Sequence, residues 1–260
     1  MSLTYSSYLK IHELLDLQVP RSDGPEHDEM LFIIIHQVYE LWFKEMLHEM
    51  DFLCGRLAAN DHWRALHTFR RILTILKVAV RQIDILETMT PVEFLTFRHR
   101  LDSASGFQSF QFREVEFALG YKRRGIFQFY EDDPVALAHL EKRYAAPTLW
   151  DAFLHYLAHN GYAIPDALLN RDVTQPLTPS EEVQRTLLEV YRCDSALTRV
   201  CERLVDLDEG LQEWRYRHVK MVERTIGTKQ GTGGSSGAGY LKGTLFKPFF
   251  PDLWAIRAEL

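Results

Sequence analysis

The sequence predicts an all-α fold, and two observations carry this prediction. Apolar side chains recur every three or four residues through several long segments, which is the period of a helix buried on one face. Alternation of period two is nowhere long enough for a sheet, and no segment repeats another. The chain has 260 residues, 46% of them hydrophobic, so it can bury a substantial core. We expect one helical domain over residues 1–260.

Two long helices are expected in the first third of the chain. The first runs from Asp28, its predicted N-cap, to about Arg56, with apolar residues at nearly every turn from Phe32 onward. The second runs from about His62 to Glu87 and carries a single apolar stripe. Both are long enough to form the centre of a helical bundle.

A further helix should begin at Thr90-Pro91-Val92-Glu93. Thr90 followed three residues later by Glu93 is a capping box, and proline suits the first helical position. Later helices are expected over residues 106–119, 134–144, 147–160, 180–205 and 207–226. The polar, proline-containing segment 170–179 interrupts this series, but the helices on either side are too apolar to form separate domains.

Charge and cysteine usage exclude several classes of protein. The net charge of −6 is unlike that of nucleic-acid-binding proteins, which normally carry a basic face. The N-terminus lacks the apolar core of a signal peptide, and no uninterrupted apolar run approaches the ~18 residues of a membrane span. Cys54, Cys193 and Cys201 form neither CxxC nor CxxCH, so any bound haem would not be linked through cysteines. We expect a soluble, cytoplasmic protein with reduced thiols.

The segment from His218 to Gly239 is the most unusual part of the chain. Five of the 14 glycines lie within Gly231–Gly239. Glycine permits positive φ and close approach of the backbone to a ligand, although such composition is also typical of a flexible linker. The apolar residues on both flanks, among them Met221 and Leu245, favour a loop that closes over a ligand.

Two of the 11 histidines stand in apolar surroundings. His36 follows three isoleucines, and His218 lies one helical turn after Trp214. Each alone fits a buried structural histidine, but together they fit a haem site, in which one neutral imidazole binds iron and the other hydrogen-bonds a substrate. His155 and His159 have the i, i+4 spacing of a metal-binding pair, but no third ligand is near, which favours a solvated helix face.

Arg113 is the third candidate for function. It follows the aromatic and polar segment 105–112, where there is little other charge. An arginine buried there needs an anionic partner. That partner is either Glu116, one turn further along, or a substrate carboxylate, which a guanidinium binds through two parallel hydrogen bonds.

Several motifs together resemble one known family. In chain order they are Tyr5–Leu9, His27–Gln37, Tyr39–Lys44, Leu86–Pro91, Ser105–Ser109 with Phe112-Arg113, Trp214–His218 and Gly231–Gly237. In this order and over nearly the whole length, they resemble the tryptophan 2,3-dioxygenase family. The resemblance implies a helical bundle around a non-covalently bound haem b, ferrous in the active form, and a homotetramer built as a dimer of dimers.

The resemblance also implies a reaction and roles for particular residues. Dioxygen cleaves the C2–C3 bond of the indole of L-tryptophan to give N-formylkynurenine, in tryptophan catabolism by the kynurenine pathway. His218 corresponds to the proximal haem ligand and His36 to the distal histidine that faces the indole N–H. Phe32 corresponds to an aromatic residue of the indole pocket, and Arg113 to the arginine that binds the substrate carboxylate.

Two further segments take their roles from the same resemblance. Thr232 corresponds to a threonine that contacts the substrate ammonium and carboxylate, with Gly231 packed beside it. Tyr5, Tyr8 and Leu9 correspond to an N-terminal segment, within residues 1–20, that contributes to a neighbouring subunit's active site.

Three positions depart from the family pattern, namely His12, Ile35 and Phe110. Near the pocket, such changes could alter which indole fits. A related haem oxygenase that inserts one oxygen atom into a substituted tryptophan is therefore an alternative function. A haem-binding sensor or carrier without turnover is a third possible function. Arg113 and Thr232 speak against it, because a carrier has no use for amino-acid recognition.

Overall fold

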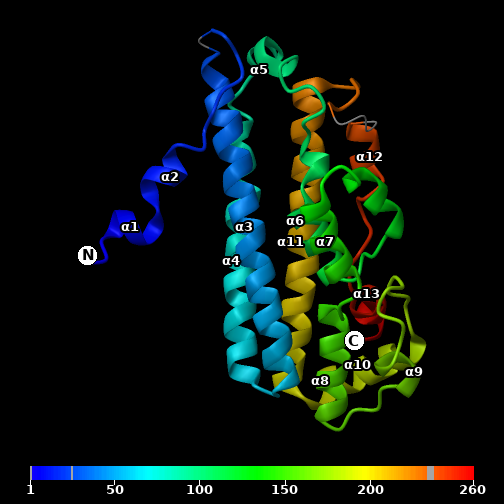
Figure 1. Cartoon of the computed structure of the whole chain (residues 1–260). Helices are drawn as coiled ribbons and strands as arrows, with labels where there is room; N and C mark the ends of the chain where they lie inside the picture. The colour runs from blue at the N-terminus through cyan, green and yellow to red at the C-terminus, as the bar shows by residue number, and fades with distance from the viewer. Residues whose placement is uncertain (1, 25, 233–236) are drawn as a thin grey trace.

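The computed structural model describes residues 2–24, 26–232 and 237–260. Over these ranges the chain contains helices and loops and no strand, so the all-α prediction is confirmed. Three long helices lie side by side and form the body of the molecule (Figure 1). They are α3 (His27–Ala58), α4 (His62–Leu86) and α11 (Ser195–Ile226).

The long helices pack through the apolar stripes visible in the sequence. On α4, Phe69, Ile72 and Ile83 are almost completely buried, and they lie about one and three turns apart on the same face. Asp61 caps this helix by accepting a hydrogen bond from the Arg64 N–H. At the start of α3 the predicted cap was wrong, because Asp28 lies inside the first turn, where a carboxylate is favourable to the helix dipole.

The boundary between the last two long helices was also predicted wrongly. The sequence suggested a break near residue 206, but α10 (Glu181–Cys193) ends earlier and α11 then runs on without interruption. Asp194 causes the break, since its carboxylate accepts hydrogen bonds from the N–H groups of Ala196 and Leu197. As a result His218 lies on one continuous helix that packs along α4.

The helix expected over 106–119 is divided into two. A short 3-10 turn, η1 (Gly106–Gln108), is followed by α6 (Phe110–Ala118). Ser109 separates them with an extended backbone and caps α6 through its hydroxyl. The predicted start at Thr90 is confirmed: α5 (Pro91–Arg98) has the capping box formed by Thr90 and Glu93.

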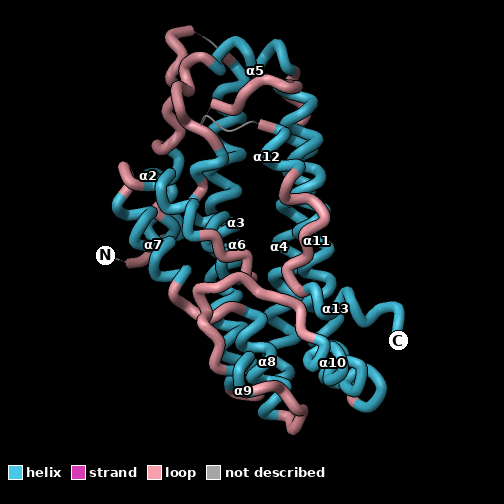
Figure 2. Tube along the Cα trace, turned by 90° about the vertical axis from the view of Figure 1, so that its right-hand side faces the viewer, coloured by secondary structure: helices cyan, strands magenta, loops and turns pink. Residues whose placement is uncertain are grey.

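The remaining elements cover the lower part and one side of the bundle. They are η2 (Arg124–Tyr130), α7 (Pro134–Tyr144), α8 (Leu149–His159), α9 (Asp166–Leu169), α12 (Ala238–Lys242), α13 (Pro251–Ala255) and η3 (Ile256–Glu259). Figure 2 shows α12 beside α11. The predicted loop 170–179 is confirmed, and Arg171 at its start forms a bidentate ion pair with Asp151 of α8. The single-domain organisation stays a prediction.

The N-terminal segment leaves the bundle. It contains α1 (Tyr5–Leu9) and α2 (Ile11–Leu15), neither of which buries a residue in this chain (Figure 1). Tyr5 is 76% exposed and Tyr8 69%. The segment rejoins α3 at Leu17 and Gln18, where the Gln37 side chain donates to the Leu17 carbonyl and accepts from the Gln18 side chain. Among the described residues, no helix is both long and apolar enough to cross a membrane.

Candidate active site

One cavity collects most of the residues that the sequence singled out. It lies between α3, α4, α5, α6 and α11, and the glycine-rich segment contributes Gly231, Thr232 and Gly237 to its lining. Six of the predicted site residues line it: Phe32, His36, Arg113, His218, Gly231 and Thr232. Tyr5, Tyr8 and Leu9 do not, because their helix lies apart from the bundle. Two imidazoles, a guanidinium and a hydroxyl therefore meet in a largely apolar space.

His218 projects from α11 into this cavity. Its ring stacks on the indole of Trp214, one turn earlier, with centroids 5.0 Å apart and planes at 21°. Burial lowers the pKa of His218 to about 4, and the neighbouring His36 and Arg113 act in the same direction. The imidazole is therefore neutral near pH 7, the state in which a ring nitrogen can bind a metal ion.

His36 faces the same cavity from α3. Its Nδ1 lies 2.7 Å from the backbone carbonyl oxygen of Phe32. A carbonyl can only accept, so Nδ1 carries the proton and Nε2 of the neutral ring is left as a hydrogen-bond acceptor. Burial lowers the pKa of His36 and so favours this neutral form. The Phe32 ring lies 4.1 Å from the imidazole, measured between centroids.

Arg113 is almost completely buried on α6, with 4% of its surface exposed. Its Nη1 donates to Glu116 Oε2 at 2.7 Å, and its Nη2 reaches the Phe107 carbonyl oxygen at 3.4 Å. The guanidinium also lies over the rings of Phe107 and Phe112. The ion pair with Glu116, one of the two partners considered from the sequence, is thus present, while Arg113 still lines the cavity.

The described residues of the glycine-rich segment and its start are hydrogen-bonded to the bundle. Thr232 donates from its hydroxyl to the Ala104 carbonyl at 2.5 Å, and Arg98 donates to the Gln230 carbonyl at 2.7 Å. Gly237 has φ of 59°, and a Cβ added there would lie 2.8 Å from the Lys229 carbonyl oxygen. Only glycine fits that position without strain. The rest of the predicted loop, residues 233–236, lies outside the described residues.

The donor set of the cavity fits a haem. A single neutral imidazole on a long, rigid helix is the ligand that a b-type haem iron requires, and the surrounding walls are mainly apolar and aromatic. His155 and His159, the other histidine pair considered, are both exposed on α8, as the prediction of a solvated face required.

Comparison with known proteins agrees with these features. The family model of tryptophan 2,3-dioxygenase matches residues 1–133 and 186–260. The chain belongs to the tryptophan 2,3-dioxygenase family. A protein named tryptophan 2,3-dioxygenase from Herpetosiphon aurantiacus is 66% identical and is matched over 100% of this chain and 99% of its own. Relatives of the same name from Anaeromyxobacter sp. strain K and Caulobacter vibrioides are 55% and 45% identical, again over almost the full length of both chains. The family recognised from the motifs is confirmed.

The three positions expected to depart from the family pattern lie outside the lining of the cavity. Ile35 is buried in the main core, and Phe110 packs near His139, in a smaller cluster around Phe117. His12 is on the N-terminal segment, where its Nε2 lies 3.2 Å from the Ser6 hydroxyl. None of these three residues lines the cavity of its own chain.

Sequence reasoning missed Arg215 among the residues that line the cavity. Arg215 is buried, lines the cavity and forms an ion pair with Glu116. Its position directly after Trp214, inside a recognised motif, was the available signal. Periodicity did not distinguish it from the half-buried Arg217, which forms ion pairs with Asp84 and Glu87.

Proposed function

We propose that this protein is a haem-dependent dioxygenase that cleaves the indole C2–C3 bond of L-tryptophan with O2 and yields N-formylkynurenine. One observation carries the proposal: two neutral imidazoles, from α3 and α11, line one apolar cavity together with a buried arginine. The relatives named tryptophan 2,3-dioxygenase support it, because they match this chain over nearly its whole length.

His218 would bind the iron of haem b. Its neutral ring needs to lose no proton to do so, and its stacking on Trp214 restricts the direction in which its nitrogen points. When bound, a ferrous haem supplies the site at which O2 is activated. The protein's own contribution is then to bind tryptophan, orient it and keep water away.

His36 would orient the indole. With its Nδ1 proton held by the Phe32 carbonyl, its Nε2 accepts a hydrogen bond from the indole N–H. Phe32, together with Phe94 and Phe97 behind it, offers an aromatic wall to the indole. In this role His36 holds the substrate through a neutral hydrogen bond and transfers no proton.

Arg113 and Thr232 would bind the amino-acid end of tryptophan. A guanidinium carries five N–H donors, so one nitrogen can hold Glu116 while the group also meets a substrate carboxylate. The Thr232 hydroxyl, now bonded to Ala104, can turn to the substrate ammonium or carboxylate, with Gly231 beside it leaving room. The glycine-rich segment would then exclude water from the substrate.

The N-terminal segment, residues 1–20, would complete the site of a neighbouring subunit in a homotetramer. Its apolar residues Tyr5, Tyr8 and Leu9 are exposed and bury nothing in their own chain, which is costly unless another surface covers them. A cytoplasmic location stays a prediction.

The test is mass spectrometry of the product formed from the ferrous holoenzyme, L-tryptophan and 18O2. Two labels in N-formylkynurenine are expected. A product with one label would support an oxygenase that inserts a single atom, and no product from protein with an intact haem spectrum would support a sensor or carrier.

A further inference from the structure

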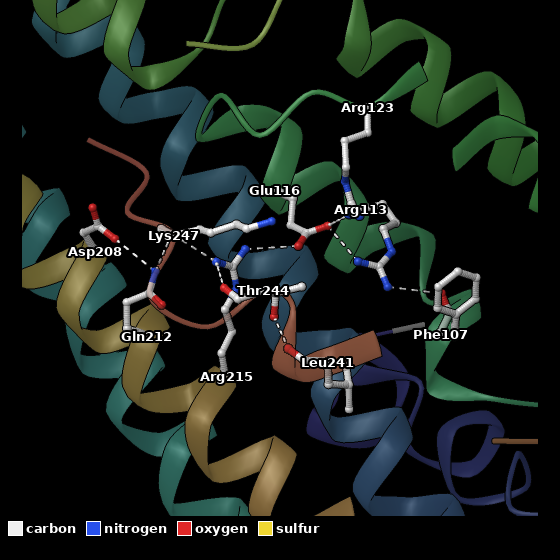
Figure 3. Close-up of polar contacts among 10 residues, drawn as sticks. All are labelled: Phe107, Arg113, Glu116, Arg123, Asp208, Gln212, Arg215, Leu241, Thr244 and Lys247. Carbon is white, nitrogen blue, oxygen red and sulfur yellow. Dashed lines mark hydrogen bonds and ion pairs between the residues drawn. The ribbon is translucent and has the colours of Figure 1, made fainter. Parts of the chain in front are cut away.

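A single buried carboxylate lies behind the substrate-binding arginine. Glu116 is 1% exposed, and its Oε2 accepts from Arg113 Nη1 at 2.7 Å and from Arg123 Nη2 at 2.6 Å. Its Oε1 accepts from Arg215 Nη2 at 3.1 Å. Figure 3 shows Arg215 approaching the carboxylate from one side and Arg113 from the other. Two helices that are distant in sequence, α6 and α11, therefore meet at this group.

The Glu116 carboxylate is shared by three guanidiniums, those of Arg113, Arg123 and Arg215. Burial alone would raise the pKa of Glu116, but the three arginines together hold it below its usual value, and the group is ionised. Arg113 and Arg215 also line the cavity. Two guanidiniums that share a buried carboxylate therefore face the space in which an anionic ligand would bind.

Arg215 extends the cluster to the chain that follows the glycine-rich segment. Its Nη1 reaches the carbonyl oxygens of Thr244 and Lys247 at 3.2 and 3.4 Å. The Lys247 carbonyl also accepts from the Gln212 side chain at 2.7 Å (Figure 3). Since Thr244 lines the cavity, a continuous set of hydrogen bonds runs from Arg113 through Glu116 and Arg215 to the cavity wall.

We infer that Glu116 is a positioning residue for substrate recognition, which holds Arg113 toward the carboxylate of tryptophan and joins it through Arg215 to residues 244–247. The inference rests on the proposed function, because it gives Arg113 a substrate carboxylate to bind. A guanidinium held by a fixed carboxylate loses less freedom when the substrate arrives, and this raises affinity. The effect should depend on the substrate having a carboxylate.

The test compares L-tryptophan with tryptamine, which lacks the carboxylate, by calorimetric titration of the holoenzyme. Glu116→Gln keeps the side-chain size and removes the charge. We expect it to weaken tryptophan binding by about tenfold or more, in the range of a lost charged hydrogen-bond partner, and tryptamine binding by less than about twofold. Glu114→Gln is the matched control, because Glu114 is also buried on α6 but contacts Arg143 and His139. It should change neither affinity.

A second comparison separates positioning from a purely structural role. In the Arg113→Leu background, Glu116→Gln should leave the ratio of the tryptophan and tryptamine affinities unchanged. The guanidinium that Glu116 positions is absent from that background. Should Glu116→Gln not fold, Glu116→Asp, which keeps the charge but shortens its reach, should give a smaller loss of the same preference. Equal weakening of both ligands, or an unaltered preference, would overturn the inference.

The outcomes distinguish this inference from the proposed function. If Arg113→Leu loses the preference for tryptophan over tryptamine and Glu116→Gln keeps it, only the role of Glu116 is overturned. Wild-type protein without preference for tryptophan over tryptamine would instead remove the proposed role of Arg113.

Discussion

The indole of Trp214 stacks on the imidazole of His218 with ring centroids 5.0 Å apart, and both project from the same face of α11. The stack restricts rotation of the imidazole before any ligand is bound. Together with its low pKa, the stack leaves His218 neutral and oriented, as the proposed binding of a haem iron requires.

The first prediction concerns that ligand. His218→Ala should lose most of its haem during purification, because no cysteine linkage or second axial ligand replaces the bond. Haem content per chain and the Soret band measure this directly. His155→Ala, on the exposed face of α8, should retain haem as wild type does. Full haem content and an unchanged Soret band in His218→Ala would show that another residue binds the iron.

The second prediction concerns His36. His36→Ala should bind haem normally and retain turnover, since a neutral positioning hydrogen bond contributes about 0.5–1.5 kcal/mol. This corresponds to a loss in kcat/KM of between about two- and twelve-fold. Steady-state kinetics with L-tryptophan provide the measurement. Complete loss of activity with tryptophan still bound would mean that His36 is an obligatory base.

Much of the fold could be predicted because helical periodicity is a local property of the sequence. The apolar stripes of α3 and α4 gave their positions to within two residues. The break at Asp194 was missed because a cap depends on one side chain and leaves the apolar stripe on either side continuous. The acidic residue Asp208 lies mid-helix for a long-range reason: its carboxylate accepts the N–H groups of Phe249 and Phe250.

The candidate site was only partly visible in the sequence for a similar reason. Arg113 and Glu116 are one turn apart on one helix, so their pairing could be considered from spacing alone. The approach of Arg215 to the same carboxylate depends on how α6 and α11 pack, and no local pattern contains that information. The family motifs identified individual residues but not the bonds between them.

The third prediction concerns Arg113. Arg113→Leu removes a charge-assisted contact to the substrate carboxylate, worth roughly 2–5 kcal/mol once the stranded charge is included. The kcat/KM for tryptophan should fall by about one and a half to three and a half powers of ten. The kcat/KM for tryptamine, which lacks the carboxylate, should differ little between variant and wild type. The haem content should not change. If the variant cleaves tryptophan as well as wild type does, Arg113 serves only as the ion-pair partner of Glu116.

The fourth prediction concerns stability and pH at Lys122, a buried residue whose ammonium donates to the carbonyls of Tyr144 and Ala146. Burial lowers its pKa from 10.5 to about 8. Between these values the unfolded chain binds more protons than the native protein, so stability rises with pH, by about 1.4 kcal/mol per pH unit at most.

This contribution appears in a difference between two proteins. The free energy of unfolding of wild type minus that of Lys122→Met, measured in urea, should be constant below pH 8 and increase from pH 8 to 10.5. Lys77→Met, on the exposed face of α4, is the control for loss of a surface lysine. A flat difference for Lys122→Met would show that its ammonium is not destabilised by burial.

The fifth prediction concerns the N-terminal segment. If Tyr5 and Tyr8 complete a neighbour's site, replacing both by alanine should lower kcat/KM about tenfold or more, the size of effect of lost aromatic anchors at an interface. Co-expressing this variant with Arg113→Leu should restore activity, because mixed assemblies contain sites with an intact arginine and an intact donated segment. Arg113→Leu with His218→Ala is the control, since both defects lie in the cavity of their own chain and cannot complement. Mixed assemblies no more active than their parents would mean that the segment serves its own subunit or none.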